Sequence, residues 1–355
     1  MKKTIMLLPG DGVGPEVVEQ GIRVLDTLAK KFHHTFIYTE GLIGAAAIDK
    51  TEVPLPDKTL TQCKQADAIL FGAIGDPRYD NDPTLKVRPE QGLLKLRKEL
   101  GLFANIRPIQ TYEPLFGKSP LKEKLLAGVD FVVIRELTGG SYFGERGRKD
   151  HNNTAYDICT YSKDEIVRIA EIAFQFAHKR KKKVTLVDKA NVLETSRLWR
   201  EIVEMISFKY SDITLENMFV DNASMQIIKN PASFDVILTE NMFGDILTDE
   251  ASVITGSIGM LPSASIGSTV ALYEPIHGSF PKAKGQNRAN PIGTILSLAL
   301  MFEHSFHQLD EAAAIRNAVN KTIELGFGTA DIATKKIASM SELTDHIITH
   351  LSTNT

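Results

Sequence analysis

The sequence predicts an α/β fold, and three observations support this prediction. Apolar runs of strand length alternate with amphipathic helical patterns along most of the chain. Most of these runs contain few polar residues, which is typical of buried parallel strands. The length of 355 residues is enough for about two domains, each with its own core. We therefore expect two domains built around a largely parallel core sheet.

The elements follow one another in a regular order. The expected strands are residues 5–8, 36–39, 68–71, 131–134, 184–187, 213–220 and 236–238. The expected helices are a first one that ends near residue 31, then 163–178, 194–206, 245–254, 292–303 and 311–324, and last turns from residue 341. Each helix shows apolar residues at helical spacing, and each strand is a short apolar run between turn residues.

Two irregular stretches suggest how the domains divide. Residues 103–160 are rich in Gly and aromatic residues, so we expect the chain to leave the first sheet there. After residue 254 the helical pattern breaks at several Gly and Pro residues, which predicts a loop-rich return. The predicted domains are therefore residues 1–102 with 256–355, and residues 103–255.

Composition narrows the classes of function. A net charge of −3, with 24% charged residues, gives no broad electrostatic reason to bind nucleic acid or an anionic membrane. Cys63 and Cys159 are the only cysteines and lack metal-type spacing, which favours a reducing compartment. The apolar run near the N-terminus is too short for a signal peptide. We expect a cytoplasmic protein without a membrane span.

Three aspartates predict a metal site. Asp245 and Asp249 are four residues apart, so they share one helix face, and Asp221 follows the expected strand at 213–220. Two carboxylates one turn apart repel each other, and a divalent cation between them would remove that repulsion. Oxygen ligands of this kind suit Mg²⁺ or Mn²⁺. The alternative is two solvated acids near a helix N-terminus, where the helix dipole tolerates them.

Arg97, Arg107 and Arg135 form a second group of candidates. Arg107 and Arg135 stand at or just after apolar runs, where strand ends commonly face a ligand. The planar guanidinium pairs with a carboxylate through two hydrogen bonds. Several arginines in one site would therefore fit a substrate with two or more carboxylates. Taken singly, each arginine is equally compatible with a surface or ion-pair role.

Two further residues have the chemistry of a proton carrier. Lys189 follows directly after the strand at 184–187, where a lysine can serve as a general base or simply face water. Tyr142 lies in a Gly-rich segment that lets a backbone approach a ligand closely, and its phenol can donate a proton. A buried structural tyrosine is the alternative.

The segment from Gly10 to Pro15 follows a strand and resembles a dinucleotide-binding turn. Its third glycine comes one position too early for G-x-G-x-x-G, and Glu40 is only an uncertain candidate for the acidic ribose ligand. We therefore expect a fold other than an ordinary Rossmann fold. Pro15 at a helix start fits a tight strand-to-helix turn.

These segments occur together and in one order, and they resemble the β-decarboxylating dehydrogenases that act on isopropylmalate and isocitrate. The resemblance spans nearly the whole chain. The matching segments are residues 8–16, 88–94, 102–108, 135–140, 188–194, 239–250, 256–264 and 274–279. It implies the two-domain fold of that family, oxidation of (2R,3S)-3-isopropylmalate by NAD⁺, loss of CO₂ to give 4-methyl-2-oxopentanoate, and a place in leucine biosynthesis.

The resemblance also implies roles for individual residues. Arg97, Arg107 and Arg135 would bind the substrate carboxylates, and Tyr142 would protonate the enol. Asp245 and Asp249 would hold Mg²⁺ or Mn²⁺ with Asp221, which also faces the substrate. Lys189, which helps to deprotonate the hydroxyl, and Asp221 would come from the second subunit of a homodimer. The residues implied at the cofactor are Gly75, Glu90, Glu274, His277, Gly278, Ser279, Lys282 and Asn290.

Substrate and cofactor choice depend on a few positions. The resemblance places substrate choice in Glu90, Leu93 and Leu94; the two leucines would meet the alkyl group and disfavour the third carboxylate of isocitrate. Lys282 stands where NAD-dependent relatives usually have aspartate, which makes use of NADP possible. Ala283 follows it, and Ala330 and Thr334 occupy later positions where NADP-dependent relatives have Tyr and Arg. We therefore expect NAD, with relaxed use possible. Gly328 is a second departure, since relatives often have arginine there.

Other functions remain open from the sequence. Within the family the alternatives are isocitrate, homoisocitrate, and tartrate or malate as substrates. A metal-dependent phosphoryl-transfer enzyme could also use the aspartates, but it would lack a P-loop lysine and leave Lys189 and Tyr142 unexplained. A catalytically inactive carboxylate-binding protein is a third possibility.

Overall fold

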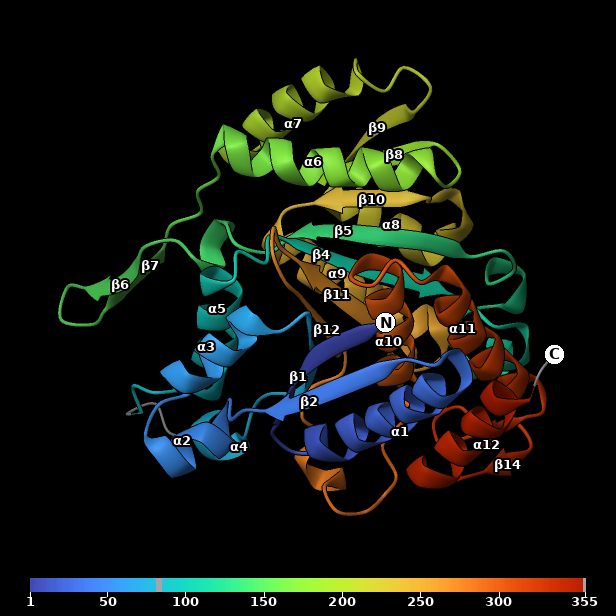
Figure 1. Cartoon of the computed structure of the whole chain (residues 1–355). Helices are drawn as coiled ribbons and strands as arrows, with labels where there is room; N and C mark the ends of the chain where they lie inside the picture. Colours follow the sequence, from blue (N-terminus) through green and yellow to red (C-terminus); the bar gives the residue numbers. More distant parts are fainter. Residues whose placement is uncertain (81–84, 354–355) are drawn as a thin grey trace. The chain divides into compact units, whose positions relative to one another are not determined.

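The computed structural model describes residues 1–80 and 85–353. Contacts group the chain into two compact units. Unit 1 consists of Met1–Leu102, Tyr112–Ser119 and Thr255–Thr355, and unit 2 consists of Phe103–Thr111 and Pro120–Ile254. The segment Tyr112–Ser119, which the sequence places in the second domain, thus groups with unit 1. Figure 1 shows the course of the chain, coloured from the N-terminus to the C-terminus.

Unit 1 is built on five strands in the order β2-β1-β3-β12-β11. β1 pairs with β2 and β3 in parallel, β3 pairs with β12 in parallel, and β12 and β11 are antiparallel. The strands are β1 (Lys2–Gly10), β2 (Thr35–Glu40), β3 (Ala68–Ala73), β11 (Pro262–Ile266) and β12 (Ala271–Pro275). The expected loop-rich return after residue 254 therefore contains a β-hairpin, which occupies a place in the sheet beside β3.

Helices cover both faces of the unit 1 sheet. Met6 and Leu8 alternate with Ile5 and Leu7 along β1, so that they point to opposite faces. The face that carries Met6 packs against residues of α3 and α5. α1 contacts β1 and β3, and α10 contacts β11 and β12. The helices are α1 (Gly14–Phe32), α2 (Ala45–Thr51), α3 (Asp57–Gln65), α4 (Pro77–Asp80), α5 (Pro89–Glu99), α10 (Ile292–His304), α11 (Leu309–Glu324) and α12 (Met340–Ser352). A short pair, β13 (Phe327–Gly328) and β14 (Lys336–Ile337), completes the unit.

Unit 2 has its own five strands, in the order β4-β5-β10-β8-β9. β4 and β5 are antiparallel, and the remaining pairs are parallel. The strands are β4 (Ala104–Gln110), β5 (Asp130–Glu136), β8 (Lys183–Asp188), β9 (Thr214–Phe219) and β10 (Val236–Thr239). The helices are α6 (Lys163–His178), α7 (Glu194–Ser207), α8 (Val220–Lys229) and α9 (Asn241–Ser252). The prediction of an α/β fold with a largely parallel sheet is confirmed.

The helices of unit 2 divide between the two faces of its sheet. α6 contacts α7 and the strands β5, β8 and β10. α8 and α9 contact each other; α8 also contacts β8 and β9, and α9 contacts β4 and β5. A separate antiparallel hairpin of β6 (Arg146–Lys149) and β7 (Thr154–Asp157) projects from the rest of unit 2 (Figure 1). The sequence gives this hairpin only as an irregular stretch.

Capping side chains explain where two helices of unit 2 begin. Ser162 accepts a hydrogen bond from the backbone N–H of Glu165, whose side chain accepts from Ser162 in return, so α6 starts at the predicted residue. Glu240 accepts a hydrogen bond from the backbone N–H of Phe243, which starts α9 at Asn241. The sequence predicts a start at Asp245, one turn later. Asp245 and Asp249 therefore both lie inside α9.

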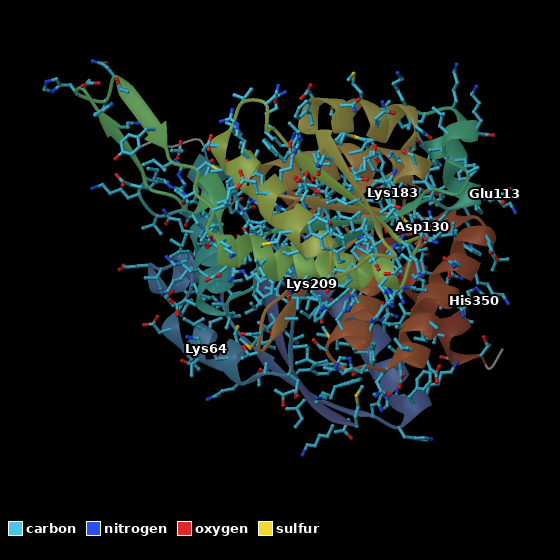
Figure 2. The ribbon with its side chains drawn as sticks, turned by 90° about the horizontal axis from the view of Figure 1, so that it is seen from above. Lys64, Glu113, Asp130, Lys183, Lys209 and His350 are labelled. Atoms are coloured by element: carbon cyan, nitrogen blue, oxygen red, sulfur yellow. The ribbon has the colours of Figure 1, made fainter. Side chains whose placement is uncertain are left out.

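The basic run at residues 179–183 is held by carboxylates of unit 2. Arg180 forms ion pairs with Asp130 and Asp235, and Lys183 pairs with Glu216. Asp130 and Lys183, which are labelled in Figure 2, belong to this group of opposite charges. The run thus has a structural role at the end of α6. Among the described residues, no helix is both long and apolar enough to span a membrane.

The glycine-rich turn after β1 is filled by the protein itself. Gly12 has a φ of +59°, and a Cβ there would lie 1.9 Å from the carbonyl oxygen of Ser279. Asp11 is 6% exposed, and its carboxylate accepts hydrogen bonds from the backbone N–H groups of Ala45, Ala46 and Gly75. The Asp11 carboxylate therefore occupies the N-terminus of α2, whereas a Rossmann fold places a phosphate at the helix that directly follows the first strand.

We predict that Asp11→Ala lowers the free energy of unfolding by about 2–4 kcal/mol, because it leaves three backbone N–H groups without their acceptor. Urea denaturation measures the change. Asp57→Ala is the matched control, since Asp57 also lies in the first turn of a helix but is exposed. Equal stability of the two variants would contradict the role of Asp11.

Candidate functional site

The structure divides the predicted site residues between the two units. Unit 1 holds Gly75, Glu90, Leu93, Leu94, Arg97, Glu274, His277, Gly278, Ser279, Lys282 and Asn290. Unit 2 holds Arg107, Arg135, Tyr142, Lys189, Asp221, Asp245 and Asp249. Each group is described within its own unit.

Four of the predicted residues of unit 2 meet at one carboxylate. Nη1 of Arg135 lies 2.5 Å from Oδ1 of Asp245, and Nη1 of Arg107 lies 3.7 Å from the same oxygen. The Tyr142 hydroxyl donates a hydrogen bond of 2.8 Å to Oδ2 of Asp245. The Arg135 guanidinium also lies 5.8 Å from the centre of the Tyr142 ring. The guanidinium groups of Arg135 and Arg107 and the Tyr142 phenol thus surround the Asp245 carboxylate.

Strand register explains why the two arginines face the same helix. Arg135 lies opposite Asn105 in the β4–β5 ladder, and Arg107 is two residues further along β4. Residues two apart on a strand share a face, so both arginines point to the face that α9 covers. Gly244 lets α9 approach β5 closely, because a Cβ there would lie 2.7 Å from Cγ of Arg135.

The pKa values of Tyr142 and Asp249 are both raised, with different consequences for what each group can do. Burial, together with the neighbouring Asp245 carboxylate, raises the pKa of the Tyr142 phenol to about 12. The phenol therefore stays protonated at neutral pH and can act as a proton donor. Burial also raises the pKa of Asp249, and repulsion from Asp245 adds to this effect. A cation between Asp245 and Asp249 would remove this repulsion, so the pair fits a divalent metal ion.

Lys189 and Asp221 form a second pair in unit 2. The Lys189 ammonium donates a hydrogen bond to Oδ1 of Asp221, and this bond lowers the pKa of the Asp221 carboxyl. Lys189 follows β8, and Asp221 lies in the first turn of α8. Among the described residues of this chain, no group of three or more His, Cys, Asp or Glu side chains is placed to hold a metal ion. Asp245 and Asp249 thus supply at most two carboxylates from one chain.

Arg97 of unit 1 is held by a carboxylate. Its Nη2 lies 3.0 Å from Oε1 of Glu274, and both side chains are buried. Nε of Arg97 is buried and has no hydrogen-bond partner among the described residues. The guanidinium therefore keeps donor capacity for a further acceptor. A Cβ on Gly75 would lie 3.1 Å from Oε1 of Glu90, which places these two predicted residues side by side.

The two leucines of α5 differ in their surroundings. Leu93 is 8% exposed and belongs to the apolar core beneath the sheet of unit 1. Leu94 is only partly buried. Leu94 is therefore the leucine with side-chain surface available to a ligand, whereas Leu93 contributes mainly to folding.

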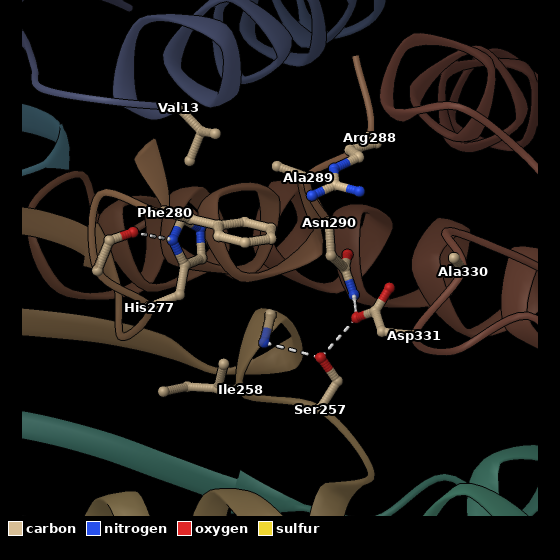
Figure 3. Close-up of a pocket in the computed structure, with 12 residues that line it drawn as sticks. Val13, Ser257, Ile258, His277, Phe280, Arg288, Ala289, Asn290, Ala330 and Asp331 are labelled. Carbon is tan, nitrogen blue, oxygen red and sulfur yellow. Dashed lines mark hydrogen bonds between the residues drawn. The ribbon is translucent and has the colours of Figure 1, made fainter. Parts of the chain in front are cut away.

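A cavity of about 560 Å³ in unit 1 is lined by three of the predicted cofactor residues, His277, Gly278 and Asn290 (Figure 3). Nδ1 of His277 lies 2.9 Å from the carbonyl oxygen of Gly278, which can only accept, so Nδ1 carries the proton. Burial lowers the pKa of His277, so the ring is neutral at physiological pH. Its Nε2 is buried without a partner among the described residues and is available as an acceptor.

The same cavity contains residues that sequence reasoning missed. Asp331 accepts hydrogen bonds from Ser257 (2.5 Å) and from Nδ2 of Asn290 (3.0 Å), and Arg288 also lines the cavity (Figure 3). Neither Asp331 nor Arg288 lies in a recognisable motif, and only their closeness in space to His277 identifies them. Lys282 is exposed and does not line the cavity.

Known proteins resemble this chain over its whole length. The family model for isocitrate/isopropylmalate dehydrogenase matches residues 4–347. A 3-isopropylmalate dehydrogenase from Heyndrickxia coagulans is 53% identical over 99% of this chain and 97% of its own length. Another protein of that name, from Aquifex aeolicus, is 52% identical over 99% and 98%.

Solved structures agree in fold. An isocitrate dehydrogenase from Methylococcus capsulatus is 32% identical, with a TM-score of 0.88 over 99% of this chain and 100% of that chain. A β-decarboxylating dehydrogenase from Thermococcus kodakarensis is 33% identical, with a TM-score of 0.80 over 98% and 96%. Sequence and fold together show that this chain belongs to the isocitrate/isopropylmalate dehydrogenase family.

Proposed function

We propose that this enzyme catalyses the metal-dependent oxidative decarboxylation of (2R,3S)-3-isopropylmalate to 4-methyl-2-oxopentanoate, with reduction of NAD⁺, in the leucine biosynthesis of the cytoplasm. The observation that carries this proposal is the cluster of Arg107, Arg135, Tyr142 and Asp245 in unit 2. It combines carboxylate recognition, a metal ligand and a proton donor. The full-length similarity to relatives named 3-isopropylmalate dehydrogenase supports the choice of substrate.

Substrate binding is the task of the three arginines. Arg107 and Arg135 present guanidinium groups next to one another, and Arg97 retains a buried N–H donor. A dicarboxylate would pair with these groups through charge-assisted hydrogen bonds. Within unit 2, Asp245 and Asn241 hold the guanidinium of Arg135, and within unit 1 Glu274 holds that of Arg97. Each of these guanidinium groups is therefore oriented before the substrate arrives, which limits the entropy lost on binding.

Asp245 and Asp249 would hold Mg²⁺ or Mn²⁺, with Asp221 of a second subunit as a further ligand. A bound divalent ion would supply Lewis acidity at the substrate hydroxyl and its adjacent carboxylate. In its neutral form, Lys189 of that second subunit would accept the hydroxyl proton as hydride leaves the carbon that bears this hydroxyl. Its ion pair with Asp221 keeps both groups together on one chain.

Tyr142 would protonate the enol that remains after CO₂ departs. Its raised pKa keeps the proton on the phenol until a strong base develops beside it. The hydrogen bond to Asp245 fixes the hydroxyl next to the metal site. After transfer, the phenolate regains a proton from solvent.

The cavity in unit 1 fits the adenosine part of a nicotinamide dinucleotide. The unpartnered Nε2 of His277 would accept a hydrogen bond from the exocyclic amine of adenine, and Gly278 and Asn290 line the same space (Figure 3). Gly75, Glu90, Glu274 and Ser279 would lie along the rest of the cofactor. When bound, the nicotinamide accepts the hydride.

Homodimer formation would bring Lys189 and Asp221 to the second active site. Exposed apolar side chains support this assembly, because α8 and α9 carry Met225 (54% exposed) and Ile246 (62%) close to the aspartates in sequence. Val253, just after α9, is also exposed. Such a surface is typical of a protein–protein interface.

The experiment that tests the function measures the initial rate of nicotinamide reduction with 3-isopropylmalate and Mg²⁺, comparing NAD⁺ with NADP⁺. We expect a higher rate with NAD⁺. Lys282→Asp should raise the KM for NADP⁺ about tenfold, since it removes a cation worth about 1.4 kcal/mol to the 2′-phosphate. Lys284→Asp, in the same exposed loop, is the matched control. Absence of turnover with either cofactor would refute the proposed reaction.

We predict that Asp245→Asn abolishes turnover together with its dependence on divalent ions, whereas Glu250→Gln on the same helix keeps both. Rates measured with and without a chelator check this. The shared site has a sharper test. When inactive Asp221→Asn and Asp245→Asn variants are mixed and reassembled, about one quarter of the wild-type rate should return, since half of the dimers are mixed and each has one intact site. No recovery in verified mixed dimers would contradict sharing between subunits.

Leu94→Ser should lower kcat/KM for isopropylmalate about ten- to a hundredfold, since the contact between two apolar groups is lost. The affinity for the cofactor should stay nearly unchanged. Leu93→Ser should in addition lower the midpoint of urea denaturation, because Leu93 is a core residue. Leu309→Ser, at an exposed leucine of the same unit, is the control. An unchanged preference for isopropylmalate over isocitrate in the double variant that carries both Leu93→Ser and Leu94→Ser would refute the assignment.

A further inference from the structure

Asn241 holds Arg135 from the side opposite the metal ligands. This asparagine is 0% exposed. Its Oδ1 accepts two hydrogen bonds from Arg135, one of 3.1 Å from Nε and one of 2.7 Å from Nη2. The remaining guanidinium nitrogen, Nη1, faces Asp245. A single carbonyl oxygen therefore fixes which edge of the guanidinium turns toward the predicted site.

The other half of the same amide reaches the segment that carries Tyr142. Nδ2 of Asn241 donates a hydrogen bond of 3.0 Å to the carbonyl oxygen of Gly139. Gly139 precedes the short 3₁₀ turn Gly140–Tyr142, whose last residue is the predicted proton donor. Asn241 thus connects the carboxylate-binding arginine to the proton donor through one rigid amide plane.

Chemistry allows only one orientation of this amide. A guanidinium can only donate, so Oδ1 must face Arg135, and a backbone carbonyl can only accept, so Nδ2 must face Gly139. No other amino acid of similar size offers an acceptor on one side and a donor on the other. Aspartate keeps the acceptor but places a second acceptor against the Gly139 carbonyl.

A buried tyrosine keeps the backbone of Asn241 in place. The hydroxyl of Tyr161 accepts a hydrogen bond of 3.0 Å from the backbone N–H of Asn241 and donates one of 2.9 Å to Glu240. Tyr161 lies against Gly139 and Gly140, since an added Cβ would come within 2.5 Å of the ring at Gly139 and within 2.4 Å of the hydroxyl oxygen at Gly140. These glycines let Tyr161 support both ends of the Asn241 bridge.

We propose that Asn241 is a positioning residue that aims the Arg135 guanidinium at the substrate carboxylate and, through Gly139, holds Tyr142 at the reacting carbon. The proposal rests on the proposed function, because it assigns Arg135 and Tyr142 the roles given above. It goes beyond that function, since Asn241 is not among the residues assigned to the substrate or the metal, and its side chain bonds Arg135 and Gly139. Its effect passes through two other side chains.

The test compares Asn241→Ala and Asn241→Asp with wild type. Asn241→Ala loses both connections, so the KM for the dicarboxylate should rise about ten- to a hundredfold and kcat should fall as well. Asn241→Asp keeps the acceptor for Arg135 but loses the donor to Gly139, so kcat should fall more than KM rises. The dissociation constant of the cofactor, measured by fluorescence titration, should change less than about twofold in both variants.

The matched control is Thr239→Val. Thr239 is buried two residues before Asn241, and its hydroxyl donates to the carbonyl oxygen of Val187 without bonding Arg135. It should lower the midpoint of urea denaturation while leaving KM and kcat nearly unchanged. If Asn241→Ala has the same kinetic constants as Thr239→Val, Asn241 has only a structural role and the proposal is overturned.

A double-variant comparison tests whether Asn241 acts through Arg135. Arg135→Lys keeps the charge but cannot make the two hydrogen bonds to Oδ1. In that background, Asn241→Ala should raise KM less than about twofold, because there is no guanidinium left to aim. Multiplication of the two single effects would overturn the proposal.

These outcomes are separable from failure of the proposed function. The wild-type rate with isopropylmalate decides the function alone. The ratios among variants are measured with whichever 2-hydroxy dicarboxylate the wild type oxidises, from a panel that includes isocitrate and tartrate. The midpoints of urea denaturation are measured without substrate for wild type, for the single variants Asn241→Ala and Arg135→Lys, and for the variant that carries both changes. Additive midpoints for Asn241→Ala and Arg135→Lys would show that the two side chains are not coupled and would overturn the proposal.

Discussion

The close approach of α9 to β5 is the constraint on which the unit 2 site depends. Gly244 permits it, since any side chain at this position would collide with Arg135. The approach lets Asn241 at the start of the helix and Asp245 one turn later contact the same guanidinium. A bulkier residue at position 244 would push the helix away and separate the arginine from both partners. The absence of a side chain at Gly244 thus allows Asn241, Arg135 and Asp245 to come together.

Compensation of buried charge is the second theme. An unpaired guanidinium in the interior would be strongly unfavourable, because burial removes its hydration. Arg135, at 1% exposure, is surrounded by the amide of Asn241 and the carboxylate of Asp245. Arg97 is similarly matched by Glu274. Each unit therefore keeps a buried guanidinium paired with a carboxylate in the absence of substrate.

Periodicity in the sequence predicts most of the buried elements because their apolar patterns are strong. α6 and α10 start where predicted, since a capping box starts one and an unbroken apolar stretch begins the other. β11 and β12 are missed, because both are short and glycines and a proline surround them, and their stability comes from pairing with β3. Local patterns contain no information about such a partner.

In the candidate site, too, sequence patterns predict some residues, and only contacts in the folded chain identify the others. Asp245 and Asp249 are visible as a spacing, and the arginines are visible at the ends or edges of apolar runs. No sequence pattern predicts a role for Asn241, Tyr161 or Asp331. Their roles follow only from the groups that they contact in the folded chain. The resemblance to a family predicts the reacting groups, and the structure shows which side chains contact them.

The arrangement of unit 1 along the chain has a consequence for synthesis on the ribosome. β12 lies beside β3, yet about 200 residues separate them, and β12 emerges only in the last third of translation. Until then β3 has an open edge of backbone donors and acceptors, which could pair with the wrong strand. Unit 2 is nearly continuous and complete by residue 254, so it can fold first. The nascent N-terminal segment therefore exposes an unpaired strand edge until most of the chain has been made.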